Sequence, residues 1–253
     1  MQKNSIITVI IIILVSFFMY KTMLIDDAAE KKHTLTIVCT TSMITDIVKT
    51  IVGDTATVYG LMGPGIDPHL YRARESDVAK LEAADIIFYN GLHLEGKMAE
   101  LFEKMAATKT TVGVADNIPK ELLLESDFAG HYDPHIWFDV SLWAQVARSI
   151  TNTLCAANQK DCPAYQERAQ IVIDQLIQLD SDIRRKIQAI PQENRILVTA
   201  HDAFSYFGRR YGFEVHGLQG ISTESEAGAK DVKNLVNLIV KKRVHAIFVE
   251  SSI

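Results

Sequence analysis

Hydrophobic and polar residues alternate along this chain with two different periods. Short runs rich in β-branched and apolar residues occur at positions 34–40, 57–62, 85–90, 196–199, 214–217 and 246–249. Between these runs apolar residues recur every three or four positions, and this spacing predicts helices over 43–51, 75–84, 94–106, 141–157, 203–211 and 227–242. Strands that alternate with helices in this way are typical of an α/β fold, in which helices cover both faces of a mainly parallel sheet.

One predicted helix, over residues 162–190, is far longer than the others. It has no glycine, and its proline, Pro163, suits a first helical turn. Its apolar stripe consists of Val172, Leu176, Leu179, Ile183, Ile187 and Ile190. A helix of about 29 residues is about 43 Å long. We interpret it as a rigid linker helix (162–191) between an N-terminal α/β lobe (33–161) and a C-terminal α/β lobe (192–253).

The last predicted strand, at 246–249, has no helix after it, whereas the earlier strands do. Strands of a parallel sheet are normally covered on both faces. We therefore expect the C-terminal lobe to be truncated in this sequence.

The N-terminus carries an apolar run from Ile6 to Tyr20. At about fifteen residues it is shorter than the roughly 20 that span a bilayer, and this length favours a signal peptide over residues 1–28. The folded part is then extracytoplasmic or periplasmic. The residues after this run match the small-x-small pattern of a cleavage site poorly, so an uncleaved inner-membrane anchor through residues 5–20 is the alternative. A lipid-modified cysteine is not expected, because the nearest cysteine is Cys39.

Composition and charge exclude several classes of protein. The 253 residues are 48% hydrophobic and 23% charged, so a disordered chain is excluded. The net charge of −5 provides no basic surface for nucleic acid. The three cysteines show no C-x-x-C spacing. Cys155 and Cys162 flank a predicted turn between helices. The sequence is equally compatible with a disulfide between them and with two buried free thiols.

Two of the eight histidines occur in the same tripeptide, Asp67-Pro68-His69 and Asp133-Pro134-His135. A third, His201, directly follows a predicted strand. Ligands of open α/β sheets bind at the carboxyl ends of the strands, and proline stiffens the backbone before each of the first two histidines. Neutral imidazole is a preferred ligand for zinc and also suits manganese, so we predict a metal site.

Four aspartates are candidates to accept hydrogen bonds from the ring N–H groups of these histidines: Asp67, Asp133, Asp139 and Asp202. Trp137 and Phe138 follow His135 and could exclude water from the metal. His93 follows a strand and is a weaker candidate ligand. The remaining histidines lack such a context.

Six motifs in order along the chain carry a resemblance to a known family. They are Gly60-Leu-Met-Gly-Pro-Gly-Ile-Asp-Pro-His69-Leu-Tyr71, Asn90-Gly-Leu-His-Leu-Glu95, Asp133-Pro-His135-Ile-Trp-Phe-Asp139, Thr199-Ala-His201-Asp-Ala-Phe204, Gly217-Leu-Gln-Gly-Ile-Ser-Thr223 and Ile247-Phe-Val-Glu-Ser-Ser252. Over residues 33–253 the chain resembles the cluster A-I (ZnuA/TroA/PsaA-like) solute-binding proteins of zinc and manganese ABC importers, especially the treponemal TroA type.

The resemblance implies a two-lobe α/β fold with one long backbone helix and a metal held between the lobes. It places metal ligands on His69, His135 and His201, and a fourth, a carboxylate, beyond residue 253. It also implies a membrane permease and a cytoplasmic ATPase as partners of a monomeric chain that binds one Zn(2+) or Mn(2+) ion and catalyses no reaction.

Two points of function stay open in the sequence. Three nitrogen ligands favour zinc over manganese by intrinsic affinity, so we predict that both are accepted and that zinc binds more tightly in vitro. The alternatives are a metal-dependent hydrolase, in which Asp202 or Glu250 would serve as general base beside a three-His zinc, and an adhesin with a structural metal. No H-E-x-x-H sequence supports the hydrolase.

Overall fold

The computed structural model describes residues 34–126, 130–224 and 226–250. The predicted signal peptide or anchor, and with it the tether through residues 5–20, lies outside the described residues. Within the described ranges no helix is long and apolar enough to cross a membrane.

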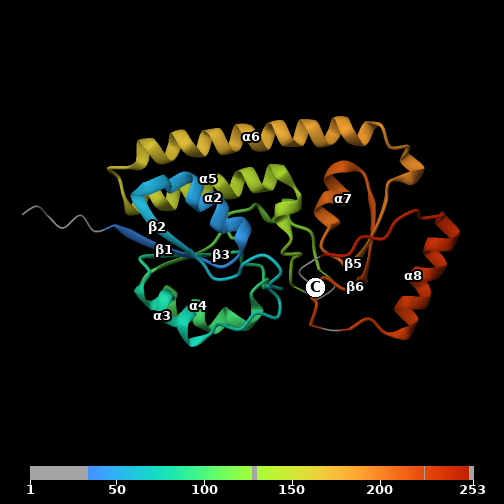
Figure 1. Cartoon of the computed structure of the whole chain (residues 1–253), viewed down its shortest axis with the longest axis horizontal. Helices are drawn as coiled ribbons and strands as arrows, with labels where there is room; N and C mark the ends of the chain where they lie inside the picture. The colour runs from blue at the N-terminus through green and yellow to red at the C-terminus, as the bar shows by residue number, and fades with distance from the viewer. Residues whose placement is uncertain (1–33, 127–129, 225, 251–253) are drawn as a thin grey trace, which may run out of the picture. The chain divides into compact units, whose positions relative to one another are not determined.

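The N-terminal lobe is built on a four-stranded parallel sheet in the order β2-β1-β3-β4 (Figure 1). Its strands are β1 (Leu35–Cys39), β2 (Ala56–Gly60), β3 (Ile86–Tyr89) and β4 (Thr110–Gly113). The last of these was not predicted. It is four residues long and only its final glycine is buried, so it lacks the apolar run by which the other strands were recognised.

Helices cover both faces of this sheet. They are α2 (Ser42–Val52), α3 (Glu75–Ala83), α4 (Ala99–Ala106) and α5 (Val140–Ala157). Successive side chains of a strand point to opposite faces. Accordingly, Ile37 packs in the cluster that holds α2 and α5, whereas Val38 packs with Leu81 of α3 and Phe102 of α4. The central strands β1 and β3 are therefore buried on both sides, as in α/β folds generally, whereas the edge strands β2 and β4 are partly exposed.

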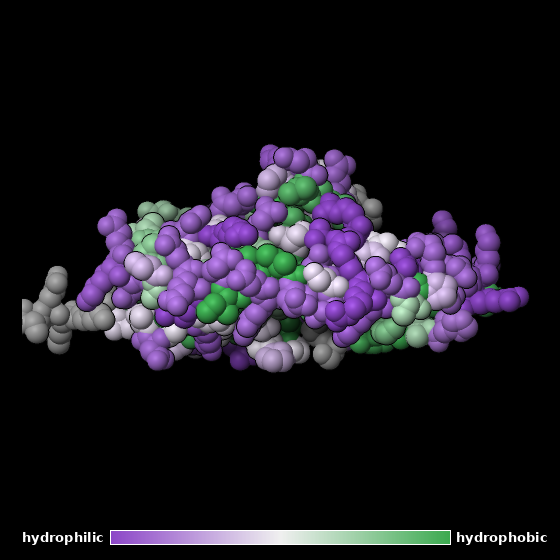
Figure 2. Space-filling view, turned by 90° about the horizontal axis from the view of Figure 1, so that it is seen from above, coloured by the Kyte–Doolittle hydropathy of each residue, from purple (hydrophilic) through white to green (hydrophobic). Residues whose placement is uncertain are grey.

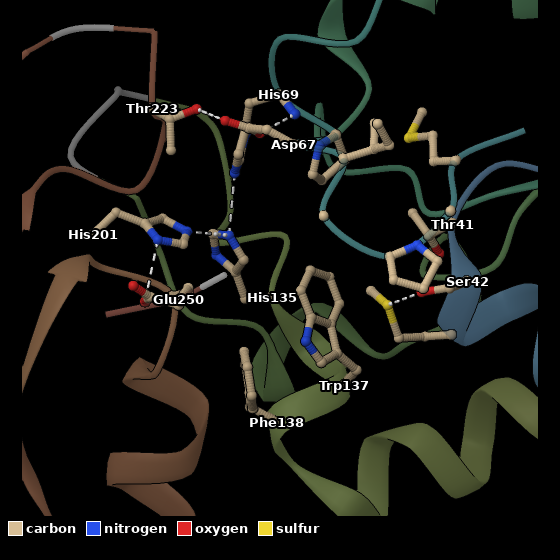
Figure 3. Close-up of a pocket in the computed structure, with 18 residues that line it drawn as sticks. Thr41, Ser42, Asp67, His69, His135, Trp137, Phe138, His201, Thr223 and Glu250 are labelled. Carbon is tan, nitrogen blue, oxygen red and sulfur yellow. Dashed lines mark hydrogen bonds and ion pairs between the residues drawn. The ribbon is translucent and has the colours of Figure 1, made fainter. Parts of the chain in front are cut away.

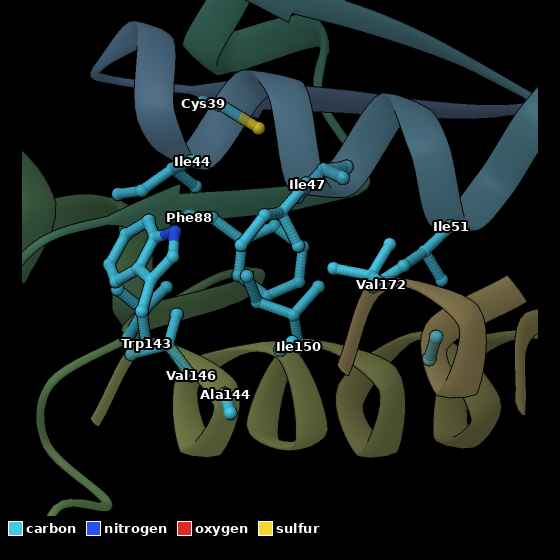
Figure 4. Packing of buried hydrophobic residues seen from close by; sticks show 14 of the residues in the cluster. Cys39, Ile44, Ile47, Ile51, Phe88, Trp143, Ala144, Val146, Ile150 and Val172 are labelled. Atoms are coloured by element: carbon cyan, nitrogen blue, oxygen red, sulfur yellow. The ribbon is translucent and has the colours of Figure 1, made fainter. Parts of the chain in front are cut away.

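The larger core lies between α2, α5 and the sheet (Figure 4). Ile44, Ile47 and Ile51 of α2 face Trp143 and Ile150 of α5 across it. This packing fixes the position of α5, whose first turn follows the His135 loop directly.

The long helix α6 (Cys162–Gln188) runs from the end of α5 to the C-terminal lobe (Figure 1). Its N-terminal half packs on α2 and α5 and buries Val172. The predicted stripe is interrupted at Leu179, which is 46% exposed because this part of the helix lies beyond the N-terminal core. Seen from the α6 side, the surface is mostly hydrophilic with scattered apolar patches (Figure 2). The lobe and linker boundaries given above stay a prediction.

The C-terminal lobe holds two parallel strands, β5 (Ile196–His201) and β6 (Glu214–Gln219), with the helices α7 (Ser205–Tyr211) and α8 (Ala229–Lys242). The strand predicted at 246–249 is wrong as a strand. A single parallel bridge joins Thr199 to Phe248, through Phe248 N–H and the Val198 carbonyl at 2.8 Å. In the described residues no further bridge extends this pairing, and the side chains of Ile247 and Val249 are exposed and outside any core.

The cysteines resolve the alternative that the sequence left open. Cys155 at the end of α5 and Cys162 at the start of α6 form a disulfide. Cys39 is a buried free thiol in β1, and burial raises its pKa above the ordinary range. The disulfide therefore fixes the turn from which α6 begins.

Candidate metal centre

Three histidines converge on one point (Figure 3). The Nε2 atom of His135 lies 3.2 Å from Nε2 of His69 and 3.4 Å from Nε2 of His201. The three ligand atoms lie within 4.8 Å of one another, and the residues are only 5%, 1% and 7% exposed. Among the described residues, this is the one group of three or more possible ligand residues that could hold a metal ion. That they bind a metal stays a prediction.

Each histidine reaches this point from a different segment. His69 lies in the loop that follows β2, where the Asp67 carboxylate accepts a hydrogen bond from its backbone N–H at 2.8 Å. His135 lies in the loop before α5, and His201 is the last residue of β5. Two of the predicted ligands therefore come from the N-terminal lobe and one from the C-terminal lobe.

Asp133 orients the His135 ring. Its Oδ1 atom accepts from the backbone N–H of His135 at 2.9 Å and lies 2.7 Å from the ring Nδ1. A carboxylate at Nδ1 places the proton on that nitrogen and leaves the lone pair on Nε2, where a metal could be bound. The other oxygen of Asp133 has no hydrogen-bond partner within the part of the chain that the structure describes.

Glu250 is the acidic residue beside His201, but in the described residues no hydrogen bond joins the two side chains. Its Oε1 atom lies 3.3 Å from Nδ1 of His201, and its side chain is 15% exposed. This contact was not predicted, because Glu250 is 49 positions away from His201 in sequence. The role that the sequence suggests for Glu250 is that of a general base in the hydrolase alternative. One sequence feature could have indicated the contact: Glu250 follows the apolar run at 246–249, just as His201 follows the apolar run at 196–199.

The other three candidate aspartates bond to hydroxyl and backbone groups around the site. Asp67 accepts from Thr223 Oγ1 at 2.6 Å in addition to the His69 backbone. Asp139 caps α5 through Ser141 N–H, and Asp202 accepts from Ser205 Oγ at 2.8 Å. These carboxylates support the backbone around the site.

Burial determines the charge state of two of the histidines. Desolvation, followed by the proximity of His135, lowers the pKa of His69 to about 4. Desolvation and the two neighbouring imidazoles lower the pKa of His201 to about 4 as well. Both rings are therefore neutral at pH 7, which is the form that binds a metal.

The histidines line a cavity of about 270 Å³ with largely apolar walls (Figure 3). Trp137 and Phe138 form one wall, and the Trp137 ring lies 5.2 Å from that of His135. Apolar walls reduce access of water and strengthen coordination. His93, the weaker candidate, lies outside this cavity; it is exposed and packs against His131 with ring centroids 4.5 Å apart.

Comparison with known proteins shows the family and the fold. The family model described as "ZnuA: Zinc-uptake complex component A periplasmic" matches residues 37–253. "Zinc-binding protein TroA" of Treponema pallidum is 47% identical over 228 residues, which are 90% of this chain and 73% of that protein. Its solved structure superposes with a TM-score of 0.84 over 86% of this chain and 78% of that one.

Two further relatives carry other names. "Manganese-binding lipoprotein MntA" of Bacillus subtilis is 44% identical over 219 residues, or 87% of this chain and 72% of the relative. "Manganese ABC transporter substrate-binding lipoprotein PsaA" of Streptococcus pneumoniae (strain TIGR4) is 33% identical over 247 residues, or 93% and 80%. With its parallel sheets, its long helix and its three convergent histidines, this chain belongs to the ZnuA family.

Proposed function

We propose that this chain binds one zinc or manganese ion between its lobes and delivers it to an ABC importer, without catalysing a reaction. The observation that carries the proposal is the convergence of three buried imidazole nitrogens, within 4.8 Å of one another, from two lobes. The names of the relatives support the choice of metal. The metal is cargo, so the site has to bind it and later release it.

The proposed ligands are Nε2 of His69, His135 and His201. All three lie in an arrangement that a zinc ion would bridge. The carboxylate of Asp133 holds the His135 ring by Nδ1, and that of Glu250 lies 3.3 Å from Nδ1 of His201. Three nitrogens leave one position of a tetrahedral zinc ion for a further donor.

We propose zinc as the tighter-binding ion in vitro. Nitrogen donors follow the intrinsic affinity order in which zinc exceeds manganese. Competition of the two ions for the purified chain, with a chelator to buffer free metal, measures this preference. Tighter binding of manganese would contradict it.

The partners and the compartment are proposed from the relatives. PsaA is named as an ABC transporter substrate-binding lipoprotein, and the family name includes "periplasmic". We propose that this chain acts outside the cytoplasm as a monomer and docks on a membrane permease that a cytoplasmic ATPase drives. The hydrolase alternative is less well supported, because both candidate general bases already have protein partners. Glu250 lies beside Nδ1 of His201, and Asp202 accepts a hydrogen bond from Ser205.

The test is elemental analysis of the purified chain beside a His69→Ala/His135→Ala variant. The parent should carry close to one zinc or manganese ion per chain, and the variant should carry neither. A His216→Ala/His245→Ala variant is the matched control, because it removes two histidines outside the cavity. The proposal fails if the parent holds no metal after incubation with zinc, or if the control loses metal as the first variant does.

A further inference from the structure

Tyr206 of the C-terminal lobe is buried completely, although it carries a hydroxyl group. That hydroxyl donates to the backbone carbonyl of Asp133 at 2.9 Å and accepts from the backbone N–H of Leu124 at 3.1 Å. Both partners belong to the N-terminal lobe, 73 and 82 positions away in sequence. The hydroxyl therefore joins the two lobes.

Leu124 and Asp133 lie opposite each other in a short antiparallel pairing of residues 124–126 with 131–133. Asp133 N–H donates to the Leu124 carbonyl at 2.8 Å, and two positions further out Ser126 N–H donates to the His131 carbonyl at 3.0 Å. In a regular antiparallel pair the Leu124 N–H would return a bond to the Asp133 carbonyl. Here the hydroxyl of Tyr206 stands between these two groups and bonds to both. The C-terminal lobe thus completes a hydrogen-bonded pair of the N-terminal lobe.

This pair immediately precedes His135. Asp133 holds the His135 ring through Nδ1, and its own carbonyl is held by Tyr206. The next carbonyl, that of Pro134, accepts from the Asn90 side chain at 3.0 Å, within the N-terminal lobe. Adjacent carbonyls of the loop that carries His135 are therefore held by different lobes.

Tyr206 also moves with another proposed ligand. His201 ends β5, and Tyr206 lies in the first turn of α7, five positions later. A movement of the C-terminal lobe that withdraws His201 from the metal would also withdraw the Tyr206 hydroxyl from Asp133.

We propose that Tyr206 is a positioning residue for His135, and that it couples the orientation of this imidazole to the position of the C-terminal lobe. The inference rests on the proposed function. Retention of the metal would then depend on a hydroxyl group that is not one of its ligands. Partners behind a metal ligand typically change affinity by 10–100-fold, and Tyr206 acts one step further away, so we expect an effect of about tenfold.

The test is Tyr206→Phe, which removes the hydroxyl and keeps the ring. Zinc dissociation, followed by stopped-flow transfer to a chromogenic chelator, should be about tenfold faster than in the parent, with association little changed. The matched control is Tyr165→Phe. Tyr165 is equally buried, and its hydroxyl contacts Thr55 and Asn158 away from the cavity, so zinc dissociation should stay at the parent rate.

A second background separates positioning from general loss of stability. In a His135→Ala chain the Tyr206→Phe change should not alter zinc dissociation further, because the ring that it positions is absent. The inference would be overturned if Tyr206→Phe and Tyr165→Phe accelerated zinc dissociation equally. It would also be overturned if Tyr206→Phe had the same effect on zinc dissociation in the His135→Ala chain as in the parent. Failure of the parent to bind zinc would instead contradict the proposed function.

Amide hydrogen exchange in the parent gives a measurement that requires no variant. The Leu124 N–H should exchange slowly in the metal-free chain and more slowly with zinc bound. Zinc-independent exchange at Leu124 would overturn the coupling even if the Tyr206→Phe chain did not fold.

Discussion

Asp180 of α6 joins the long helix to the C-terminal lobe. Replacing it should weaken this connection and lower the stability of the fold. Its carboxylate accepts from Arg210 Nε at 3.1 Å and Nη2 at 2.9 Å, and from the hydroxyl of Tyr211 at 2.9 Å. A further bond comes from Arg184 at 3.1 Å, one turn along α6. Asp180→Asn keeps the size of the side chain and removes the charge that these four donors share.

The expected loss follows from the exposure of each partner. The Arg184 side chain is 47% exposed, and an exposed pair of this kind contributes at most about 0.5 kcal/mol. Arg210 and Asp180 are 27% and 18% exposed, so their paired bonds and that of Tyr211 together contribute about 1.5 kcal/mol. The total of about 2 kcal/mol corresponds to a fall in Tm of roughly 4–8 °C for a chain of this size.

The pH dependence of this loss has a definite sign. Burial alone would raise the pKa of Asp180, but the bonds from Arg210, Arg184 and Tyr211 lower it overall. A carboxyl with a lowered pKa in the folded state stabilises the fold above its unfolded pKa of about 3.9. That stabilisation is lost as the pH falls through the folded pKa. The difference in Tm between parent and Asp180→Asn should therefore be constant from pH 7 to pH 5 and shrink below pH 4.

Scanning calorimetry of the metal-free chain at pH 7, 5 and 3.5 measures both effects. Asp174→Asn is the control, because this aspartate lies on the same helix and, in the part of the chain that the structure describes, bonds to Gln170 in an exposed pair. Its Tm should stay close to that of the parent. Equal Tm values for Asp180→Asn and the parent at pH 7 would refute the reasoning, as would a difference that persists unchanged at pH 3.5.

Three further changes have defined outcomes. Asp133→Asn should weaken zinc binding about 10–100-fold in chelator competition, and unchanged affinity would show that this carboxylate does not orient a ligand. Cys155→Ser/Cys162→Ser should lower the free energy of unfolding by about 2.5 kcal/mol in urea while zinc affinity stays at the parent value. Gly217→Ala would drive a Cβ into the backbone of Asp202 and should cost about 1–3 kcal/mol, so a neutral result in the same urea assay would contradict the close approach.

The regular elements could be predicted because their apolar residues repeat with a clear period. The long stripe of α6 and the buried runs of β1 and β3 are examples. β4 was missed because it is short and mostly solvent-accessible, and the strand predicted at 246–249 reduces to one bridge at Phe248. Periodicity reports which residues are apolar, but it does not report whether a neighbouring strand is present to pair with them.

The meeting point of the three histidines was predictable only in part. His69 follows β2 and His201 ends β5, so two of them lie at the carboxyl ends of strands, where open α/β sheets bind ligands. These strands belong to different sheets and His135 lies in the loop before α5, so the convergence itself depends on how the lobes pack. The contact of Glu250 with His201 and that of Tyr206 with Asp133 required the packing of whole elements. The sequence gives no local signal for the Tyr206 contact, and for Glu250 only its place just after an apolar run.

The C-terminal lobe contributes more to the site than one imidazole. Each Asp-Pro-His unit of the N-terminal lobe also bonds to a hydroxyl from the C-terminal lobe: Thr223 to the Asp67 carboxylate at 2.6 Å, and Tyr206 to the Asp133 carbonyl at 2.9 Å. A rigid-body movement of this lobe that withdraws His201 would therefore stretch both bonds. Under the proposed function, one displacement of the C-terminal lobe removes a ligand and loosens the support of the other two. This explains how a buried three-imidazole site could hold its ion tightly and still release it in one step.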